Sequence, residues 1–276
     1  MERTNPYMPM PAVIDSVTVE TPTIKTYVVR PERPFAFEAG QFAELSIPGS
    51  GEAPFTPSSS PEVSDELAFT VMRVGHLTER LHGMMPGDRI GLRGPLGQPY
   101  PLDAFRGRDI LIAGGGVGLA PLRALLFALF TDPGCCPNII LRYGARTPAD
   151  IVYREALERK WGQNGLLDVM TTVDAGDDAW EGHVGVVTTI LDKDTIHCDP
   201  ATAVAVVCGP PVMMRFTTFK LLETGFPPSS IYLSMEKNMS CGIGKCGHCR
   251  VGTWYACNDG PVFSYDNLQS APKVFA

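Results

Sequence analysis

Four of the eight cysteines stand close together near the end of the chain. Cys241, Cys246 and Cys249 are followed, after seven further residues, by Cys257, which makes a C-x4-C-x2-C…C pattern. Thiolates at this spacing are typical of a plant-type [2Fe-2S] cluster, in which four cysteines bind two irons. Glycines alternate with the cysteines, and glycine tolerates the positive φ that such a tight loop requires. We therefore predict that these four cysteines are the ligands of a [2Fe-2S] cluster.

A structural zinc site is the alternative interpretation of the same cysteines. Zinc ligands more often form two separate pairs, with about two to four residues between the members of each pair. Here three of the four cysteines share one loop, which favours the cluster. His248 lies inside this loop, but we do not assign it as a ligand because four thiolates already complete the set.

A glycine cluster at 114–118 is a second candidate site. An apolar run at 110–113 leads into it, and an apolar helical stretch follows at 120–130. A strand, a glycine turn and a helix start in this order can present backbone N–H groups to a pyrophosphate. The spacing is not G-x-G-x-x-G, and a tight turn that binds no ligand would read the same way. This segment alone therefore leaves nucleotide binding open.

Two further residues follow predicted strands in the same region. Cys208 ends an apolar run, and ligands of open α/β sheets bind beyond the carboxyl ends of strands, so it is a candidate for the lining of a nicotinamide pocket. A lone cysteine is, however, more often a small buried apolar residue. Arg146 follows the run at 139–143, where no carboxylate stands to accept ribose hydroxyls. Arg146 would meet a 2′-phosphate or face solvent, so both NAD and NADP stay open.

The elements that must position these residues change in type along the chain. Short alternating apolar stretches between Pro and Gly turns fill the first hundred residues without a long helical period, and they predict an antiparallel barrel or sandwich. Beyond them, apolar runs and helical stretches alternate and predict about five parallel strands. The strand candidates are 110–113, 139–143, 167–173, 203–208 and 231–235, and the helix candidates are 120–130, 149–161, 186–191 and 212–223. From 236 onward periodicity ends, and we expect a cofactor rather than a core to hold this tail.

Composition excludes several classes of protein. The net charge of -7 gives no general attraction to nucleic-acid phosphates. No apolar run reaches the ~20 residues of a membrane span. The opening residues 1–6 lack the apolar core of an export signal. We expect a cytoplasmic protein, with no nucleic-acid or membrane partner, whose thiols stay reduced.

The order of these segments resembles the ferredoxin-NADP reductase superfamily over about residues 10–235. The resemblance rests on a barrel, a Gly-Pro-Leu-Gly linker at 94–97, the glycine turn at 114–121 and Cys-Gly-Pro-Pro at 208–211. With the cysteine loop added, the whole chain is similar to FAD- and NAD(P)-binding electron-transfer subunits of dihydroorotate dehydrogenase, anaerobic sulfite reductase and cytoplasmic NiFe hydrogenases. Its tail is most similar to the gamma subunit of the hydrogenases, also called sulfhydrogenases.

The resemblance implies three units and a set of site residues. It implies an antiparallel β-barrel flavin domain at 1–104, an α/β open parallel-sheet nucleotide domain at 105–235 and a small iron–sulfur subdomain at 236–276. Thr56 and Cys208 are implied to act in the reaction itself. The positions implied for FAD are Phe55, Thr56, Val71, Met72, Arg73, Gly75, His76, Leu77 and Thr78. Those implied for NAD(P) are Gly114, Gly115, Gly116, Val117, Gly118, Ala120, Pro121, Arg146, Cys208, Gly209 and Met213.

One position departs from the family pattern. Ala53 stands where the family has an arginine that binds the flavin phosphate, so Arg73 or backbone N–H groups would have to compensate. Glu236 is implied to lie near the junction of nicotinamide and flavin, although a solvated carboxylate would explain it equally well.

The resemblance also implies a function. NAD(P)H would give a hydride to the flavin, and the flavin would release electrons singly to the [2Fe-2S] cluster. The electrons would then pass to further iron–sulfur and catalytic subunits of a hetero-oligomeric complex, for which a NiFe hydrogenase is our first choice. The alternatives are the sulfite reductase and dihydroorotate dehydrogenase complexes, a stand-alone oxygenase-type reductase, and a non-enzymatic nucleotide-binding module with a zinc site.

Overall fold

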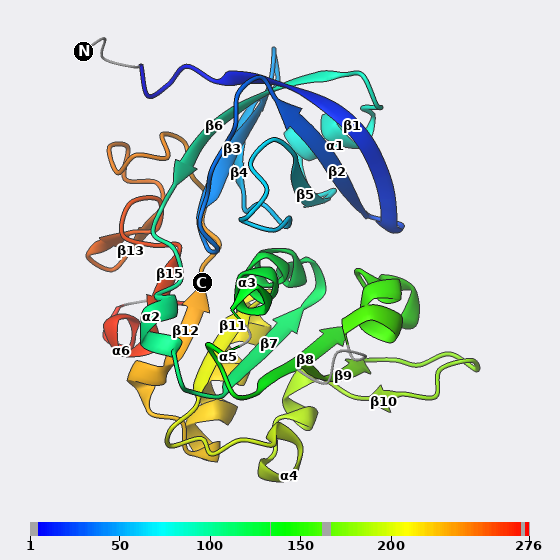
Figure 1. Cartoon of the computed structure of the whole chain (residues 1–276), viewed down its shortest axis with the longest axis vertical. Coiled ribbons are helices and arrows are strands. Elements are labelled where there is room, and N and C mark those ends of the chain that lie inside the picture. The colour runs from blue at the N-terminus through cyan, green and yellow to red at the C-terminus, as the bar shows by residue number, and fades with distance from the viewer. Residues whose placement is uncertain (1–4, 133, 162–166, 272–273, 276) are drawn as a thin grey trace.

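An antiparallel sheet forms the N-terminal part of the computed structural model, which describes residues 5–132, 134–161, 167–271 and 274–275. Neighbouring strands pair in the order β4-β3-β6-β1-β2-β5, and every pair is antiparallel. The strands are β1 (Met10–Thr21), β2 (Ile24–Pro31), β3 (Phe42–Ile47), β4 (Gly51–Phe55), β5 (Leu67–Met72) and β6 (Arg89–Leu96). Their inward side chains, such as Val29, Leu45 and Phe69, are almost fully buried and form one core. The predicted antiparallel domain is confirmed, and Figure 1 shows it curving over the rest of the molecule.

Helix α1 (His76–His82) interrupts this domain, although the sequence pattern predicted no helix there. The pattern missed it because the helix has only seven residues, too few for a helical period to emerge. Leu77 and Leu81 pack into the core of the antiparallel domain and hold the helix against the sheet. A short helix α2 (Leu102–Phe105) then leads into the second domain.

The second sheet has seven strands in the order β10-β9-β8-β7-β11-β12-β15. The strands are β7 (Ile110–Gly115), β8 (Ile139–Ala145), β9 (Leu167–Val173), β10 (His183–Val184), β11 (Val204–Cys208), β12 (Ile231–Ser234) and β15 (Val262–Ser264). All neighbours except β12 and β15 pair in parallel. Strands β7 and β11 are buried at every residue because helices cover both faces of a parallel sheet. The five predicted parallel strands are confirmed.

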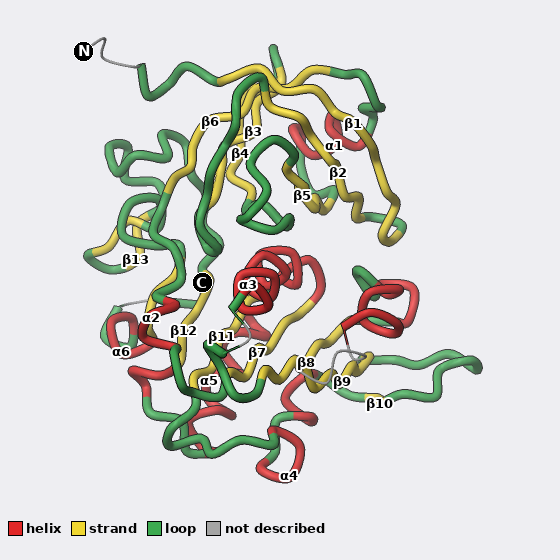
Figure 2. The backbone as a smooth tube through the Cα atoms, viewed as in Figure 1, coloured by secondary structure: helices red, strands yellow, loops and turns green. Residues whose placement is uncertain are grey.

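Two long helices cover this sheet, one on each face (Figures 1 and 2). Helix α3 (Leu119–Thr131) begins directly after the 3-10 turn η1 (Gly116–Gly118) and packs Leu122 and Leu125 against one face. Its Ala124 belongs to the core of the antiparallel domain, so α3 lies between the two sheets. Helix α5 (Pro211–Thr224) packs against the other face and begins at a proline, whose fixed φ suits a first helical position.

The prediction of one continuous helix at 149–161 is wrong. The chain forms a 3-10 turn η2 (Pro148–Asp150) and a π-helical turn η3 (Ala156–Trp161), and between them Tyr153 has a φ of 55°. The backbone N–H of Tyr153 donates to Glu20 Oε2 at 3.1 Å, and its hydroxyl hydrogen-bonds Thr70 of the antiparallel domain. These contacts with the other domain override the local helical preference. The predicted helix at 186–191 is a 3-10 turn, η5 (Val187–Ile190).

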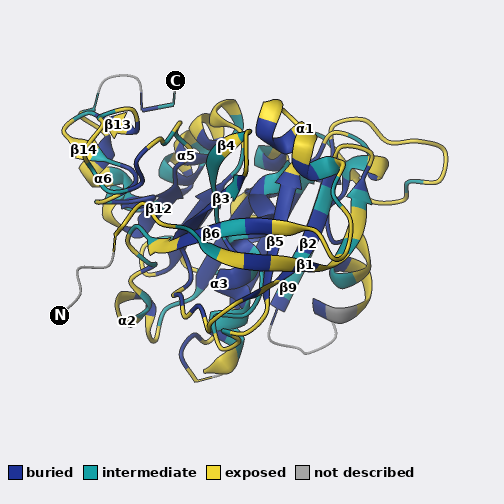
Figure 3. Ribbon diagram, turned by 90° about the horizontal axis from the view of Figure 1, so that it is seen from above, coloured by how far each residue is buried: buried dark blue, intermediate teal, exposed yellow. Residues whose placement is uncertain are grey.

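Three short helices also lie in this part of the chain. They are α4 (Lys193–Ile196), η6 (Pro228–Ser230) and α6 (Tyr265–Leu268). Figure 3 shows the buried strands at the centre of the molecule and the exposed residues on the outer loops. Among the described residues, none of the helices combines the length and apolar character needed to span a bilayer.

The C-terminal segment has an apolar core contact that the sequence pattern did not predict. Strand β15 pairs antiparallel with β12, and Phe263 and Leu268 join the core on the α5 side of the sheet. Three of the cysteines, Cys241, Cys249 and Cys257, are buried at 7%, 1% and 2% exposure. A two-stranded ribbon of β13 (Arg250–Val251) and β14 (Trp254–Tyr255) completes the segment. The expectation that a cofactor rather than a core holds this tail is therefore wrong. The sequence did not show the strand because three residues are too few to display a period.

Candidate functional site

The cysteine loop is shaped so that backbone amides point at the thiols. Gly242, Gly244 and Gly247 have φ values of 69°, 73° and 79°, which L side chains rarely adopt. The amides of Lys245 and Cys246 donate to Cys241 Sγ at 3.3 and 3.4 Å. The amide of Gly244 donates to Cys257 Sγ at 3.1 Å. Such N–H groups stabilise negative charge on sulfur, so the loop fits an anionic iron–sulfur cluster.

The four thiols lie as two pairs. Cys246 interacts with the side chain of Cys241, and Cys257 with that of Cys249. Among the described residues, no three His, Cys, Asp or Glu side chains surround a position suited to one metal ion. The backbone N–H of His248, followed by the Cys241 side chain, lowers the pKa of the exposed Cys246 thiol to about 7. Burial raises the pKa of Cys257 to about 12.

A buried arginine of the antiparallel domain supports this loop. Arg93 of β6 is only 4% exposed, and its Nη1 donates to the carbonyl oxygen of Cys241 at 3.0 Å. Its Nη2 and Nε donate to the two carboxylate oxygens of Glu52 at 2.7 and 3.3 Å. Glu44 of β3 is fully buried, and its nearest approach to Arg93 Nη2 is 4.0 Å. Sequence reasoning missed this group, although Glu44 and Arg93 interrupt apolar strands and so signalled it.

Glu44 is a buried carboxyl without a hydrogen-bond partner in the described structure. Burial, and then repulsion from Glu52, raises its pKa from 4.5 to about 8, while Arg93 opposes the change. The folded state thus binds this proton more tightly than the unfolded state. The stabilisation that protonated Glu44 gives the folded state is complete below pH 4.5 and is lost as the pH rises toward about 8.

We expect Glu44→Gln to remove this decrease in stability with rising pH, because the amide keeps the shape of the side chain without its charge. The free energy of unfolding of the iron-free variant should match the wild type near pH 5 and exceed it at pH 8 by about 1–3 kcal/mol. Urea unfolding followed by circular dichroism at several pH values measures this. The exposed Glu32→Gln is the control, and the same pH slope in both variants would contradict the assignment.

A cleft of about 380 Å³ lies where the two domains and the C-terminal segment meet. The antiparallel domain contributes the end of β4, part of β5 and Thr78 of α1. The parallel sheet contributes residues beyond the carboxyl ends of β7, β8 and β11, the edge at which open α/β sheets bind ligands. The predicted site residues that line it are Phe55, Thr56, Met72, Thr78, Val117, Gly118, Ala120, Pro121, Arg146, Cys208 and Gly209.

Other predicted residues lie outside the cleft lining. Val71 is fully buried and points into the core of the antiparallel domain, as does Leu77. Arg73 is 45% exposed, and its Nε lies 3.8 Å from Glu79. Gly75 and His76 begin α1. Gly114, Gly115, Gly116 and Met213 are not among the residues that line the cleft.

The glycine turn at 114–118, which we call the nucleotide turn, is packed tightly against the end of β11. A Cβ placed on Gly118 would lie 2.6 Å from the carbonyl oxygen of Cys208 and 2.7 Å from Cα of Gly209. The sulfur of Met213 would lie 2.7 Å from a Cβ on Gly209 and 3.2 Å from one on Gly115. Only glycine at position 118 lets the turn lie this close to the backbone at the end of β11. Burial raises the pKa of Cys208 to about 12, so its thiol is neutral in the cleft at physiological pH.

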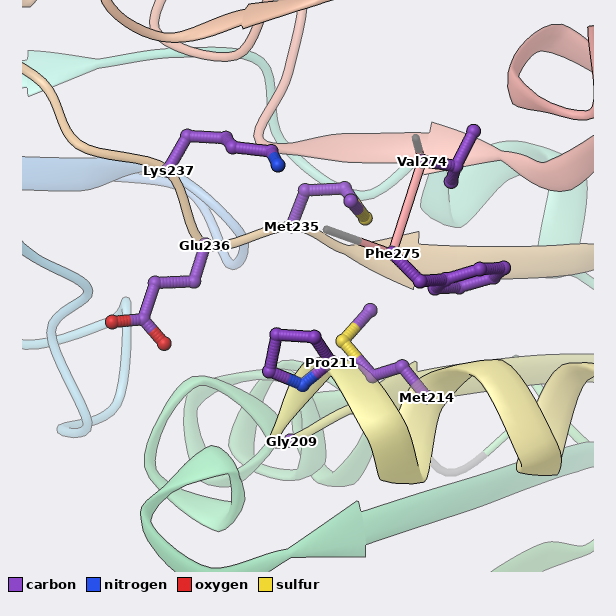
Figure 4. A pocket seen from close by; sticks show the side chains of 8 residues that line it. All are labelled: Gly209, Pro211, Met214, Met235, Glu236, Lys237, Val274 and Phe275. Atoms are coloured by element: carbon purple, nitrogen blue, oxygen red, sulfur yellow. The ribbon is translucent and has the colours of Figure 1, made fainter. Parts of the chain in front are cut away.

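Several cleft residues were not predicted. They are Phe42, Pro54, Thr70, Val74, Pro210, Pro211, Ser234, Met235, Lys237, Met239 and Pro261. Most are apolar or small, so residue type alone carried no signal for them. Glu236 also lines the cleft, and Figure 4 shows it extending away from the side chains of Met214, Met235 and Phe275 around a neighbouring small cavity.

Two family models match the chain. Residues 111–218 match the oxidoreductase NAD-binding domain, and residues 236–269 match the iron–sulfur cluster binding domain of dihydroorotate dehydrogenase B. The parallel sheet and the cysteine loop described above fall within these two matches. Fold, cleft and cysteine loop thus define an NAD-binding oxidoreductase of the ferredoxin reductase type with an iron–sulfur domain.

Curated relatives match over most of their length. The sulfhydrogenase 1 gamma subunit of Pyrococcus furiosus is 34% identical over 99% of this chain and 97% of its own, and the sulfhydrogenase 2 gamma subunit is 36% identical over 85% of each. A probable dihydroorotate dehydrogenase B electron transfer subunit of Methanocaldococcus jannaschii is 34% identical over 93% of this chain and 90% of its own. The solved NADH-dependent reduced ferredoxin-NADP oxidoreductase superposes with a TM-score of 0.74 at 27% identity, covering 98% of this chain and 93% of that one. The chain belongs to the family of these gamma subunits and electron-transfer subunits.

Proposed function

We propose that the cleft binds a flavin and NAD(P)H side by side, and that the chain moves electrons between NAD(P)H and a partner subunit through a [2Fe-2S] cluster. The single observation behind this proposal is the meeting of three walls in one cleft. One wall contains Phe55 and Thr56, the second contains Gly118 and Cys208, and the third, with Met239 and Pro261, leads into the cysteine segment. The cleft is therefore bordered by the nucleotide turn and by residues on either side of the cluster loop.

Bound in this cleft, FAD would take a hydride from NAD(P)H and release its electrons singly to the cluster. The residues of the chain supply alignment. The ring of Phe55 offers an apolar face, and the Thr56 hydroxyl offers a hydrogen bond to a polar ring atom. Gly118 lets the turn and the end of β11 approach each other closely, and the neutral thiol of Cys208 adds no charge where a nicotinamide would lie.

We place the chain in a complex with a NiFe hydrogenase, in which it exchanges electrons with further iron–sulfur and catalytic subunits. The support is the similarity to two sulfhydrogenase gamma subunits. The second candidate is the electron-transfer role in a dihydroorotate dehydrogenase, which the match of residues 236–269 supports. We also propose the division into units at 1–104, 105–235 and 236–276, and a cytoplasmic location.

Anaerobic purification tests the electron path. Two irons and one flavin per chain are expected, together with flavin bands in the visible spectrum. Addition of NADH or NADPH should bleach these bands and produce an electron paramagnetic resonance signal from the reduced cluster, and this identifies the preferred nicotinamide. A colourless protein that holds zinc would overturn the proposal in favour of a nucleotide-binding module.

The complex purified from its native source distinguishes the two partners. A hydrogenase complex should reduce NAD(P)+ with hydrogen gas, and a dihydroorotate dehydrogenase complex should reduce NAD+ with dihydroorotate. Activity with dihydroorotate and none with hydrogen would replace the first candidate by the second.

Arg73 is the cation we expect to contact the flavin phosphates, because it stands between Met72 and Val74 of the cleft lining and its exposed side chain would turn from Glu79 toward the flavin. Ala53 provides none, and the amides of Val74 and Gly75 already donate to the Thr78 hydroxyl at 2.9 and 2.8 Å. A charge-assisted hydrogen bond contributes about 1.5–3 kcal/mol, so Arg73→Ala should weaken FAD binding about 10-fold or more. Fluorescence titration of the flavin-free protein measures this, with the exposed Arg89→Ala as control. If Arg73→Ala and Arg89→Ala bind FAD with equal affinity, Arg73 does not contact the phosphates and backbone N–H groups bind them instead.

A further inference from the structure

The cysteine loop differs in charge from the rest of the chain. Residues 237–258 contain Lys237, Lys245 and Arg250 and not one Asp or Glu, whereas the whole chain has a net charge of -7. Lys245, His248 and Arg250 are all exposed. Glu236 and Asp259 bound this segment and a bound cluster would itself be negative, so the positive charge lies on the exposed side chains Lys245 and Arg250. Exposed cations of this kind attract negatively charged partners.

Cys246 is the one ligand cysteine that the described structure exposes, since the other three are at most 7% exposed. Electrons that leave a cluster here would have their shortest way out at Cys246. Two cations are close to it in the sequence, because Lys245 directly precedes Cys246 and Arg250 follows four residues later. The part of the surface nearest the outgoing electron is therefore the positive part.

Nearby carboxylates have partners of their own. Glu52 is bound by the buried Arg93, and Asp259 accepts the Tyr255 amide at 2.7 Å and the Asn258 side chain at 3.0 Å. No ion pair joins Lys245 or Arg250 to a carboxylate among the described residues. Both side chains are exposed, and Nε of Arg250 donates to the carbonyl oxygen of Gly252 at 3.1 Å.

An aromatic side chain lies close to Lys245. Tyr7, from the segment before β1, is 46% exposed, and its ring centre lies 6.0 Å from Nζ of Lys245 and 5.9 Å from Cζ of Arg93. Tyrosine and arginine are enriched in the buried centres of protein interfaces, where lysine is depleted. Tyr7 thus offers an apolar contact beside a charged rim. We call Tyr7, Lys245, Cys246, His248 and Arg250 the cluster face.

We propose that the cluster face is the docking surface for a redox protein or subunit whose own electron-accepting centre is surrounded by Asp and Glu side chains. This proposal rests on the proposed function and adds the place and the charge of the contact. One electron passes from the reduced cluster to the acceptor centre, which is reduced by one electron, and no proton or bond is exchanged. Attraction between the positive face and the negative partner speeds encounter and orients the two centres.

Two small acceptors of opposite charge test the proposal: acidic rubredoxin and basic cytochrome c. The holoprotein is reduced with dithionite, desalted and mixed with either acceptor in a stopped-flow instrument, and the absorbance of the cluster reports its reoxidation. The wild-type rate constant with rubredoxin should fall as salt is added, whereas that with cytochrome c should not. This comparison needs no variant.

Lys245→Glu/Arg250→Glu reverses both exposed charges. At low ionic strength it should slow reoxidation by rubredoxin about 10-fold or more and speed reoxidation by cytochrome c. Lys193→Glu/Arg159→Glu makes the same change of charge on exposed residues of α4 and η3, and its rates should stay within about twofold of the wild type. The resonance signal of each reduced variant shows whether its cluster is intact.

Opposite shifts for the two acceptors support docking at the cluster face. Shifts in the same direction would mean that the substitutions changed only the cluster potential, and they would overturn the proposal, as would the absence of any shift. Failure of the proposed function gives a different result, because the wild-type protein would then contain no reducible cluster and no reoxidation would be seen with either acceptor.

Discussion

Replacement of Arg93 by methionine should both destabilise the fold and release the iron. The variant keeps much of the apolar stem but removes the cation between Glu44 and Glu52, and removing one partner of a buried charge cluster costs about 3–5 kcal/mol. It also removes the donor to the carbonyl oxygen of Cys241. Denaturant unfolding of the iron-free protein measures the first effect, and the iron content after gel filtration measures the second.

Arg30→Met is the matched control for this prediction. Arg30 is 62% exposed and pairs with Asp15 at 3.0 Å on the same sheet, and exposed pairs of this kind contribute about 0–1 kcal/mol. If both variants unfold at the same denaturant concentration and retain the same iron, Arg93 does not support the cysteine loop.

Gly118→Ala should abolish tight NAD(P)H binding. The φ of Gly118 is -62°, which alanine adopts easily, so the effect comes from contact alone. The new Cβ would meet backbone atoms of Cys208 and Gly209 at 2.6–2.7 Å, and backbone at the end of a central strand cannot rotate away. The turn must then move off β11. Forcing extra volume into such a packed site costs about 1–3 kcal/mol in stability, and the widened cleft should bind NAD(P)H at least about 10-fold more weakly.

Gly83→Ala is the control, because its Cβ would make an ordinary contact of 3.5 Å with the carbonyl oxygen of Arg80, away from the cleft. Fluorescence titration with NADH and denaturant unfolding of both variants give the comparison. Binding by Gly118→Ala as tight as by Gly83→Ala would show that the turn and the end of β11 do not form the nicotinamide site.

Patterns of neighbouring residues predicted much of this molecule. Apolar runs placed the parallel strands, because strands buried on both faces need apolar residues throughout. The spacing of the cysteines placed Cys241, Cys246 and Cys249 in one short loop, and in the structure the four thiols lie as two pairs. The predicted cleft residues of the parallel sheet, such as Gly118 and Cys208, stand at strand ends or in the glycine turn, where the rule for open sheets applies. Those of the antiparallel domain, such as Phe55 and Thr56, came from the family resemblance.

Contacts between distant segments could not be predicted in this way. The helix expected at 149–161 is broken by contacts of Tyr153 with Glu20, 133 residues earlier. Arg93 and Cys241 are 148 residues apart, and no local pattern links them. The apolar cleft residues Met239 and Pro261 have no chemical signature, so only the fold brings them to the cleft.

The pairing of β15 with β12 has a consequence for the synthesis of this protein. Domains generally fold from the N-terminal side as the chain leaves the ribosome. Here the β12 edge of the parallel sheet stays open until Val262–Ser264 has been synthesised, which happens only after the whole cysteine loop. An open edge strand is a template for pairing with other chains, so nascent or truncated chains should be prone to aggregate. Assembly of the parallel sheet and enclosure of the cysteine loop are therefore completed in one step, when β15 pairs with β12.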